Sequence, residues 1–343
     1  MMKLKSYQKT ILYTILHFIV DGICACVVFS KLYNEDYTTC LSVFFIYNFL
    51  AFLSQPFVGI LMDKYFQPKL FLLISVVMLS LGYLFSFQFI LSSICLGIGN
   101  SFFHVCGGKD VTIKSKNDIV SIGVFVSTGA IGLVLGQRCY SEALLISFFS
   151  IMFVVALLLI ISKEEKIDRE MNWSTGVKSN KEILFLSLIL IVVAIRSFVG
   201  KIIILDFEVS LGIFIGIAVA TALGKALGGV VAKCLGPTKT ILISMSIAIM
   251  CLCLGNFNPY ILCLGVLMFN FSMPITLYYA NRISNGKEGF AFGALAAALI
   301  PGYLLGMLEY SSFVSKLCII ILSVVSALLV CFICRGIKQN GDS

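Results

Sequence analysis

Two ionisable residues lie one helical turn apart in the first apolar run, which reads Leu16-His17-Phe18-Ile19-Val20-Asp21-Gly22. Residues four apart share one face of a helix, so the imidazole and the carboxyl group should point the same way. An aspartate at the centre of a membrane helix costs about 2.5–3.5 kcal/mol on insertion scales, so it should face a bundle interior or a water-filled cavity. Such a pair can exchange protons. The alternative is structural: an interior ion pair that fixes helix packing.

Further polar residues occur in later apolar runs. They are Asn100 and His104, then Lys109, Arg196, Lys201 and Lys225, and finally Asn270. The four basic residues outnumber Asp21, which favours an anionic or zwitterionic ligand attracted by Arg196 with Lys201 or Lys225. His104 is a second candidate for proton exchange, and again the alternative is a packing role. Lys109 and Asp110 are expected to form an exposed pair at the mouth of their run.

The composition requires these residues to be positioned by membrane helices. Of the 343 residues, 59% are hydrophobic and 12% charged, with a mean hydropathy of +1.04, whereas soluble domains carry about 25% charged residues. A soluble protein is therefore excluded. The apolar runs are continuous and about twenty residues long, which indicates spanning helices rather than a β-barrel. The net charge of +8 follows membrane topology and does not indicate nucleic-acid binding.

Twelve apolar segments can be counted, and turn residues separate them. They lie near 10–31, 39–62, 69–88, 89–110, 119–137, 141–162, 183–205, 209–233, 238–255, 259–281, 289–308 and 314–336. Most of the 25 Lys and Arg residues fall on one side if both termini are cytoplasmic. The charged stretch 163–182 is predicted to link an N-terminal bundle, 1–162, to a C-terminal bundle, 183–343. We expect a multi-pass protein of the cell membrane.

An internal repeat relates the two halves at an offset of about 170 residues. The pairs are Gly59 with Gly229, Asn100 with Asn270, Gly123 with Gly293, Gly132 with Gly302, and Gly136 with Gly306. Glycines in membrane helices let neighbouring helices approach closely, and Pro301 permits a kink. Duplicated bundles of transporters hold their substrate between the halves, near the midplane.

A motif follows the second segment: Gly59-Ile-Leu-Met-Asp63-Lys64, with Lys69 beyond it. It resembles the loop signature of the major facilitator superfamily, in which a glycine is followed by an aspartate and a basic residue. The resemblance implies that Asp63 forms a cytoplasmic charge lock against a helix N-terminus or an arginine. The repeat counterpart places Lys233 where the aspartate would be, so the second half departs from the pattern.

Several motifs together are similar to the fosmidomycin-resistance branch of that superfamily. They are His-Phe-x-x-Asp in the first segment, Gly-Asn-x-x-Phe-His in the fourth, the glycines of the fifth and Arg-Ser-Phe in the seventh. In that branch a proline and an acidic residue usually follow the histidine, whereas Val105 and Cys106 stand here. The named drug is therefore not carried over. The glycine-rich fifth segment is typical of antiporters and favours export.

The sequence therefore predicts an all-α secondary transporter with two six-helix bundles and alternating access. It should move a small organic anion or zwitterion, coupled to protons, as a monomer in the lipid bilayer. No cofactor or metal site is expected, because the 13 cysteines lie almost all in apolar runs. Two alternatives are a membrane-embedded enzyme with a histidine base and a non-transporting sensor. No nucleotide-binding glycine loop is present.

Overall fold

The computed structural model describes residues 4–30, 36–163, 179–205, 210–254 and 258–339. All elements in these ranges are helices. The first half contains α1 (Ser6–Ala25), η1 (Cys26–Ser30), α2 (Tyr37–Asn48), η3 (Phe49–Leu53), α3 (Gln55–Lys64), α4 (Pro68–Leu84), α5 (Phe89–Lys114), α6 (Ile119–Phe125), α7 (Gly129–Arg138) and α8 (Glu142–Ile161). The second contains α9 (Asn180–Leu205), α10 (Leu211–Leu235), α11 (Pro237–Leu254), α12 (Pro259–Phe269), α13 (Ser272–Ile283), α14 (Glu288–Ala297), α15 (Leu299–Leu305) and α16 (Ser312–Gln339).

The apolar runs form helices because backbone polar groups in a bilayer must be satisfied within the segment. Within the described residues, 11 helical stretches are long and apolar enough to cross a membrane, and α4 is a shorter apolar helix of 17 residues. Each of the twelve predicted segments coincides with one of these twelve stretches. The segment expected near 69–88 corresponds to α4, which ends at Leu84. Most of the predicted linker, 164–178, lies outside the described residues.

Four of the spans are interrupted within the described residues. The second breaks at Ser54 between η3 and α3, the fifth at 126–128 between α6 and α7, the tenth at 270–271 between α12 and α13, and the eleventh at Ala298 between α14 and α15. Pro274 and Pro301 follow the breaks in the tenth and eleventh spans. Proline lacks an N–H and clashes with the carbonyl group four residues before it, which explains both positions.

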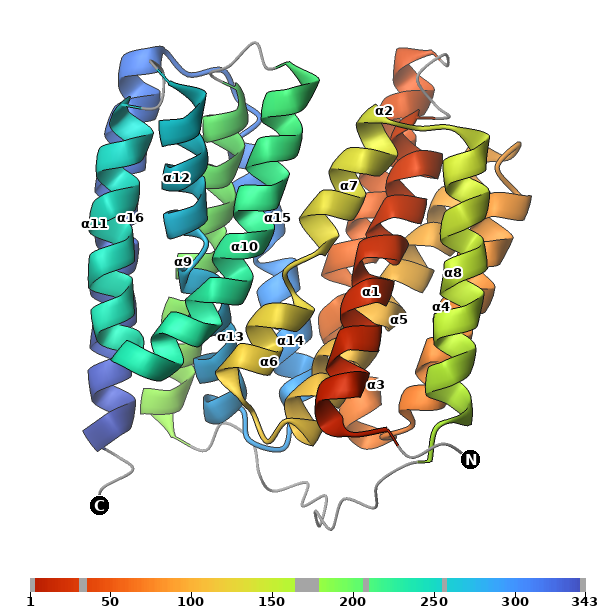
Figure 1. Cartoon of the computed structure of the whole chain (residues 1–343), viewed down its shortest axis with the longest axis horizontal. Coiled ribbons are helices and arrows are strands. Elements are labelled where there is room, and N and C mark those ends of the chain that lie inside the picture. Colours follow the sequence, from red (N-terminus) through yellow and green to blue (C-terminus); the bar gives the residue numbers. More distant parts are fainter. Residues whose placement is uncertain (1–3, 31–35, 164–178, 206–209, 255–257, 340–343) are drawn as a thin grey trace.

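The helices form two bundles that lie side by side, one from each half of the sequence (Figure 1). Helix α1 packs against α5, α7 and α8 in one bundle, and α9 packs against α15 and α16 in the other. Across the boundary, α3 packs on α14 and α6 on α10. In Figure 1, α1 begins and α16 ends at the bottom of the molecule, which we call the lower end.

The repeated glycines make equivalent contacts in the two halves. A Cβ atom on Gly59 would overlap the carbonyl group of Gly289, and one on Gly229 would lie 2.6 Å from the carbonyl oxygen of Ile119. The two contacted residues are again 170 apart (289 − 119). Neither Gly59 nor Gly229 has room for a side chain, so the bundles approach each other backbone to backbone at the lower end.

Glycine contacts within each bundle repeat as well, but with a slightly different offset between the contacted residues. A Cβ atom on Gly132 would overlap the carbonyl oxygen of Phe18, and one on Gly302 would overlap that of Ala194. Gly136 and Gly306 likewise approach the first helix of their own bundle. The contacted residues are 176 apart (194 − 18), so α9 is displaced by six residues relative to the offset of the other helices.

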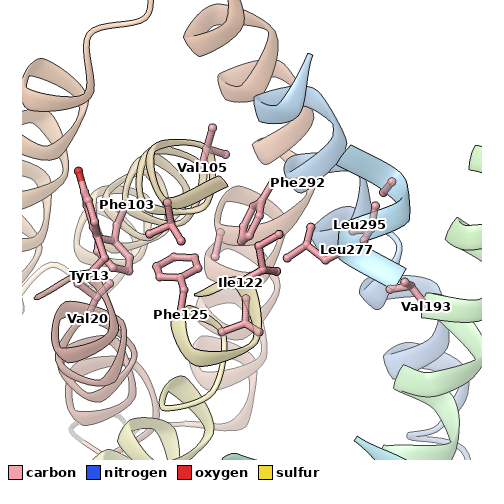
Figure 2. Packing of buried hydrophobic residues seen from close by; sticks show 14 of the residues in the cluster. Tyr13, Val20, Phe103, Val105, Ile122, Phe125, Val193, Leu277, Phe292 and Leu295 are labelled. Atoms are coloured by element: carbon pink, nitrogen blue, oxygen red, sulfur yellow. The ribbon is translucent and has the colours of Figure 1, made fainter. Parts of the chain in front are cut away.

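Apolar side chains interlock the two bundles. Figure 2 shows Phe292 of α14 pointing toward Ile122 and Phe125 of α6. The Phe125 and Phe292 ring centroids are 6.0 Å apart, and both residues are buried. This packing joins α6 of the first bundle to α14 of the second.

Candidate functional site

A cluster of three ionisable side chains lies inside the first bundle. Helix α1 supplies His17 and Asp21, and α5 supplies His104. The two Nε2 atoms are 3.1 Å apart, His17 Nε2 is 3.3 Å from Asp21 Oδ2, and His104 Nε2 is 3.5 Å from Asp21 Oδ1. The spacing of four residues in α1 thus produces the expected shared face, and the neighbouring helix adds the second imidazole.

The Nδ1 atoms of the two imidazole rings are hydrogen-bonded to backbone carbonyl groups. His17 Nδ1 is 2.8 Å from Phe125 O, and His104 Nδ1 is 3.0 Å from Asn100 O. A carbonyl oxygen only accepts, so both Nδ1 atoms carry a hydrogen. The two Nε2 lone pairs and the Asp21 carboxylate then converge, and one further proton shared among them makes the cluster neutral. The arrangement has room for one further proton among these three groups.

Neighbouring side chains bury most of the cluster but leave part of it exposed to solvent. Asn100, 2% exposed, donates from Nδ2 to Asp21 Oδ1 at 3.3 Å, and the Phe103 and Phe125 rings lie against His17. The Asp21 side chain is 20% exposed, His104 13% and His17 8%. Asp21 is therefore the part of the cluster that water or an ion reaches first.

The second bundle presents cations instead. Arg196 of α9 is 9% exposed, and its Nη1 donates to Thr276 Oγ1 of α13 at 3.2 Å. Within the described residues neither Arg196 nor Lys225 of α10 has a carboxylate within ion-pair distance. Lys225 is partly buried and lies within electrostatic range of Arg196 and Asp21. Buried cations without a counterion attract an anion, because the alternative is uncompensated charge in a low-dielectric interior.

Two of the predicted site residues, Lys201 and Asn270, belong neither to the ionisable cluster nor to the pair of cations. Lys201 lies over the Tyr303 ring, 5.0 Å from its centroid. The Asn270 side chain turns back onto its own helix and donates to Val266 O at 2.8 Å. The repeat thus places Asn100 and Asn270 at matching positions, but only Asn100 contacts the ionisable cluster.

Asp63 lies at the boundary between the bundles, at the lower end. Its carboxylate accepts hydrogen bonds from the backbone N–H groups of Gly289 and Phe290 at 2.8 Å each. These groups begin α14, so the carboxylate binds the positive end of a helix, as the motif implies. Lys109 adds an ion pair at 2.6 Å. The exposed Lys64 instead lies over the Tyr65 ring.

The second bundle makes a matching contact with opposite charge. Lys233 of α10 donates to Asp118 Oδ1 at 2.7 Å, and Asp118 caps α6 by accepting from Ser121 N at 3.0 Å. Partial burial of Asp118 would raise its pKa, but these two hydrogen bonds outweigh the burial and hold the pKa below its usual value. The Lys233 side chain is 62% exposed, so this contact is more exposed to solvent than the one at Asp63.

The expectation of an exposed Lys109–Asp110 pair was wrong. Lys109 is 2% and Asp110 1% exposed. Lys109 binds Asp63, whereas Asp110 pairs with Lys114 one turn further on, at 2.7 Å. The fourth run extends as α5 to Lys114, so both residues lie within the helix and not at its mouth.

Sequence reasoning missed several partners of the site. No pattern in the sequence indicates that the carbonyl group of Phe125 would accept a hydrogen bond from His17. Gly129 had one, as part of the glycine-rich fifth segment: a Cβ atom there would lie 2.5 Å from His17 Nε2. The possibility of a metal site was missed as well, because only the fold brings His104 to the pair in α1; the three residues have ligand atoms within 4.8 Å of one another.

Comparison with known proteins identifies the fold through structure. No family model and no curated protein sequence matches the chain. A structure of a variant of the E. coli fucose:proton symporter is similar with a TM-score of 0.70 at 14% identity, covering 96% of this chain and 99% of that one. An outward-facing bacterial homologue of the iron transporter ferroportin gives a TM-score of 0.59 at 14% identity, covering 98% and 100%.

The chain has the major facilitator fold. The similarity extends over nearly the whole length of both neighbours and includes both bundles. At 14% identity it carries no residue roles, and neither neighbour identifies the fosmidomycin-resistance branch.

Proposed function

We propose that this major facilitator protein is a secondary active transporter of a small organic anion or zwitterion, coupled to protons. The proposal rests on how charge is divided between the bundles. The first contains the cluster of His17, Asp21 and His104, and the second contains Arg196 and Lys225, which have no carboxylate partner among the residues that the structure describes. Binding between two bundles that rock about the site is the general mode of such transporters.

Proton coupling is supported by the hydrogen-bond pattern of the cluster. Both Nδ1 atoms are committed to carbonyl groups, so proton gain or loss is confined to the two Nε2 atoms and Asp21. The cluster is neutral with the shared proton and carries one negative charge without it. Lys225 lies within electrostatic range of Asp21. A change of one unit of charge on the cluster would therefore alter how strongly Lys225 attracts an anion.

An anionic substrate is supported by Arg196 and Lys225. An arginine within a bundle presents a planar set of donors suited to carboxylate or phosphate groups. Its hydrogen bond to Thr276 engages one nitrogen, Nη1. A carboxylate bound to the remaining donors would neutralise the charge that the protein leaves uncompensated.

Alternating access requires the lower end to open, which means breaking the Asp63 and Lys233 contacts. We therefore infer that Asp63, with the glycine contacts at Gly59 and Gly229, stabilises the conformation described here. Lys64 is proposed to act with Asp63 as part of the same loop motif, and Gly132, Gly136, Gly302 and Gly306 are proposed to act in helix packing. We further propose a cell-membrane monomer with cytoplasmic termini at the lower end, working in export.

A ligand screen followed by transport tests the proposal. Purified protein is heated with single compounds from a panel of small carboxylates, phosphates, amino acids, sugars and organic cations, since a bound ligand raises the melting temperature. We expect anionic or zwitterionic members to stabilise the wild type but not Arg196→Gln. These ligands should then be transported by proteoliposomes in response to a pH gradient. Stabilisation by organic cations or sugars alone would refute the anion site.

A further inference from the structure

The separations within the cluster of His17, Asp21 and His104 match those of ligands on one metal ion. First-row divalent ions lie about 2.0–2.2 Å from nitrogen and oxygen ligands. Two ligands on the same ion are therefore about 2.9 Å apart in octahedral and about 3.5 Å apart in tetrahedral geometry. The observed separations are 3.1 Å between the two Nε2 atoms, 3.3 Å from His17 Nε2 to Asp21 Oδ2 and 3.5 Å from His104 Nε2 to Asp21 Oδ1. Because the two rings approach different carboxylate oxygens, an ion held by both rings would bind both oxygens of Asp21 or require a rotation of that carboxylate.

The orientation of both imidazoles is a second, independent observation. Metal-binding histidines almost always donate from the other ring nitrogen to a carboxylate, a backbone carbonyl or water, which fixes the tautomer and directs the free lone pair at the ion. Here both Nδ1 atoms donate to carbonyl oxygens, at 2.8 Å and 3.0 Å. The Nε2 lone pairs are thereby aimed at the same point as the Asp21 carboxylate.

Gly129 has no side chain and so leaves space beside the ligand atoms. A Cβ atom on Gly129, at the start of α7, would overlap Asp21 Oδ2 and lie 2.5 Å from His17 Nε2. The 20% exposure of the Asp21 side chain gives a route of entry. Three protein ligands leave one or more coordination positions for water, the pattern of an open rather than a closed metal site.

We propose that His17, Asp21 and His104 bind one first-row divalent transition-metal ion, coordinated through the two Nε2 atoms and the carboxylate. Two imidazoles and a carboxylate suit ions from manganese to zinc. The two neutral rings and one carboxylate leave a net charge of plus one on the loaded site. A bound ion uses the lone pairs that otherwise hold the shared proton, so the ion and the proton exclude each other. The inference does not depend on the identity of an organic substrate.

Cobalt binding to the full chain in detergent tests this proposal. The protein is prepared without a polyhistidine tag and treated with chelator, and Co²⁺ alone is added while the visible d–d bands are recorded. Because the chain has only 2 histidines, binding through imidazole is assigned without ambiguity. We expect one Co²⁺ per chain, no thiolate charge-transfer band, and at least a ~10-fold weaker affinity in both His17→Gln and His104→Gln.

Two further variants keep the result interpretable. Gly129→Ala retains all three ligands but fills the space beside them, so it should also weaken Co²⁺ binding. Glu309→Gln removes an exposed carboxylate between α15 and α16 and should leave the affinity unchanged. Thermal unfolding of each variant checks that it is folded.

Either of two results would overturn the proposal. One is an absence of Co²⁺ binding by folded wild type. The other is binding with a thiolate band that both histidine variants retain, because the ion would then be held by cysteines. Proton-driven transport by the same preparation is measured separately, so failure of the metal site leaves the proposed transport function standing and the reverse holds as well.

Discussion

The two bundles repeat each other's backbone contacts but not each other's chemistry. Gly59 and Gly229 approach partners 170 residues apart (289 − 119), with no room for a side chain at either. The centre of the first bundle contains a closed hydrogen-bonded cluster around Asp21, whereas the second contains Arg196 and Lys225 without carboxylate partners in the described chain. The close packing is thus common to the two halves, whereas the polar residues differ.

The same divergence occurs at the lower end. Asp63 is 7% exposed and binds backbone donors of α14, whereas Lys233 is 62% exposed and binds a carboxylate that caps α6. The two contacts are alike in position and opposite in charge. We infer that the first bundle holds the coupling ion and the tighter closing contact, and that the second holds the substrate.

The largest expected effect comes from Asp21→Asn. The amide cannot take up the shared proton, so accumulation driven by a pH gradient should fall by about 100-fold or more, which corresponds to about 2.7 kcal/mol. Proteoliposome uptake of a substrate found in the screen measures the effect. Glu309→Gln is the control and should transport normally. Undiminished gradient-driven accumulation in Asp21→Asn would refute coupling through this cluster.

In the second bundle, Arg196→Gln should act on binding instead. Losing a hydrogen bond to a charged group costs about 1.5–3 kcal/mol, so the dissociation constant of the substrate should rise by about 10- to 150-fold. Lys225→Gln should weaken binding less, because Lys225 is only partly buried and its charge is better screened by solvent than that of the buried Arg196. Equilibrium binding of the labelled substrate measures both variants. An unchanged affinity in Arg196→Gln would mean that the arginine only supports packing.

At the lower end, Asp63→Asn should weaken closure. The amide lacks the charge that stabilises the α14 N-terminus and leaves Lys109 buried without its partner, so opening should become about tenfold more frequent. Hydrogen exchange at the amides of Gly289 and Phe290, the two donors to Asp63, measures this directly. Glu309→Gln changes an exposed charge outside this contact and should leave both exchange rates as they are. Equal exchange in Asp63→Asn would contradict the closing role.

The smallest effect is expected for Lys233→Met. The bridge to Asp118 is exposed, so the melting temperature should change by no more than about 2 °C. Because the pKa of Asp118 is lowered in the folded protein, its contribution is present above the unfolded pKa of about 4 and is lost as the pH falls further. The difference from wild type should thus persist from pH 7 to pH 5 and vanish below about pH 4. A difference that disappears near pH 6 would point to another group.

Sequence patterns predicted the fold and part of the site for identifiable reasons. Apolar runs of membrane length determined the helices, and the spacing of His17 and Asp21 determined a shared face. The glycine offset anticipated contacts that the structure contains. Sequence could not bring α5 against α1, so the meeting of His104 with Asp21 was not foreseen. The burial of Lys109 was missed because its partner, Asp63, lies 46 residues away, and the pairing of Lys233 with Asp118 depends on contact between the bundles.

The central claim is that coupling and substrate recognition reside in different bundles, and comparing exchange with accumulation tests it most directly. Proteoliposomes preloaded with unlabelled substrate exchange it for labelled substrate without any net proton movement. Asp21→Asn should retain this exchange while losing accumulation driven by a pH gradient, and Arg196→Gln should lose both at low substrate concentration. If folded Asp21→Asn lost exchange and accumulation to the same extent, or retained both, the division between the bundles would be wrong.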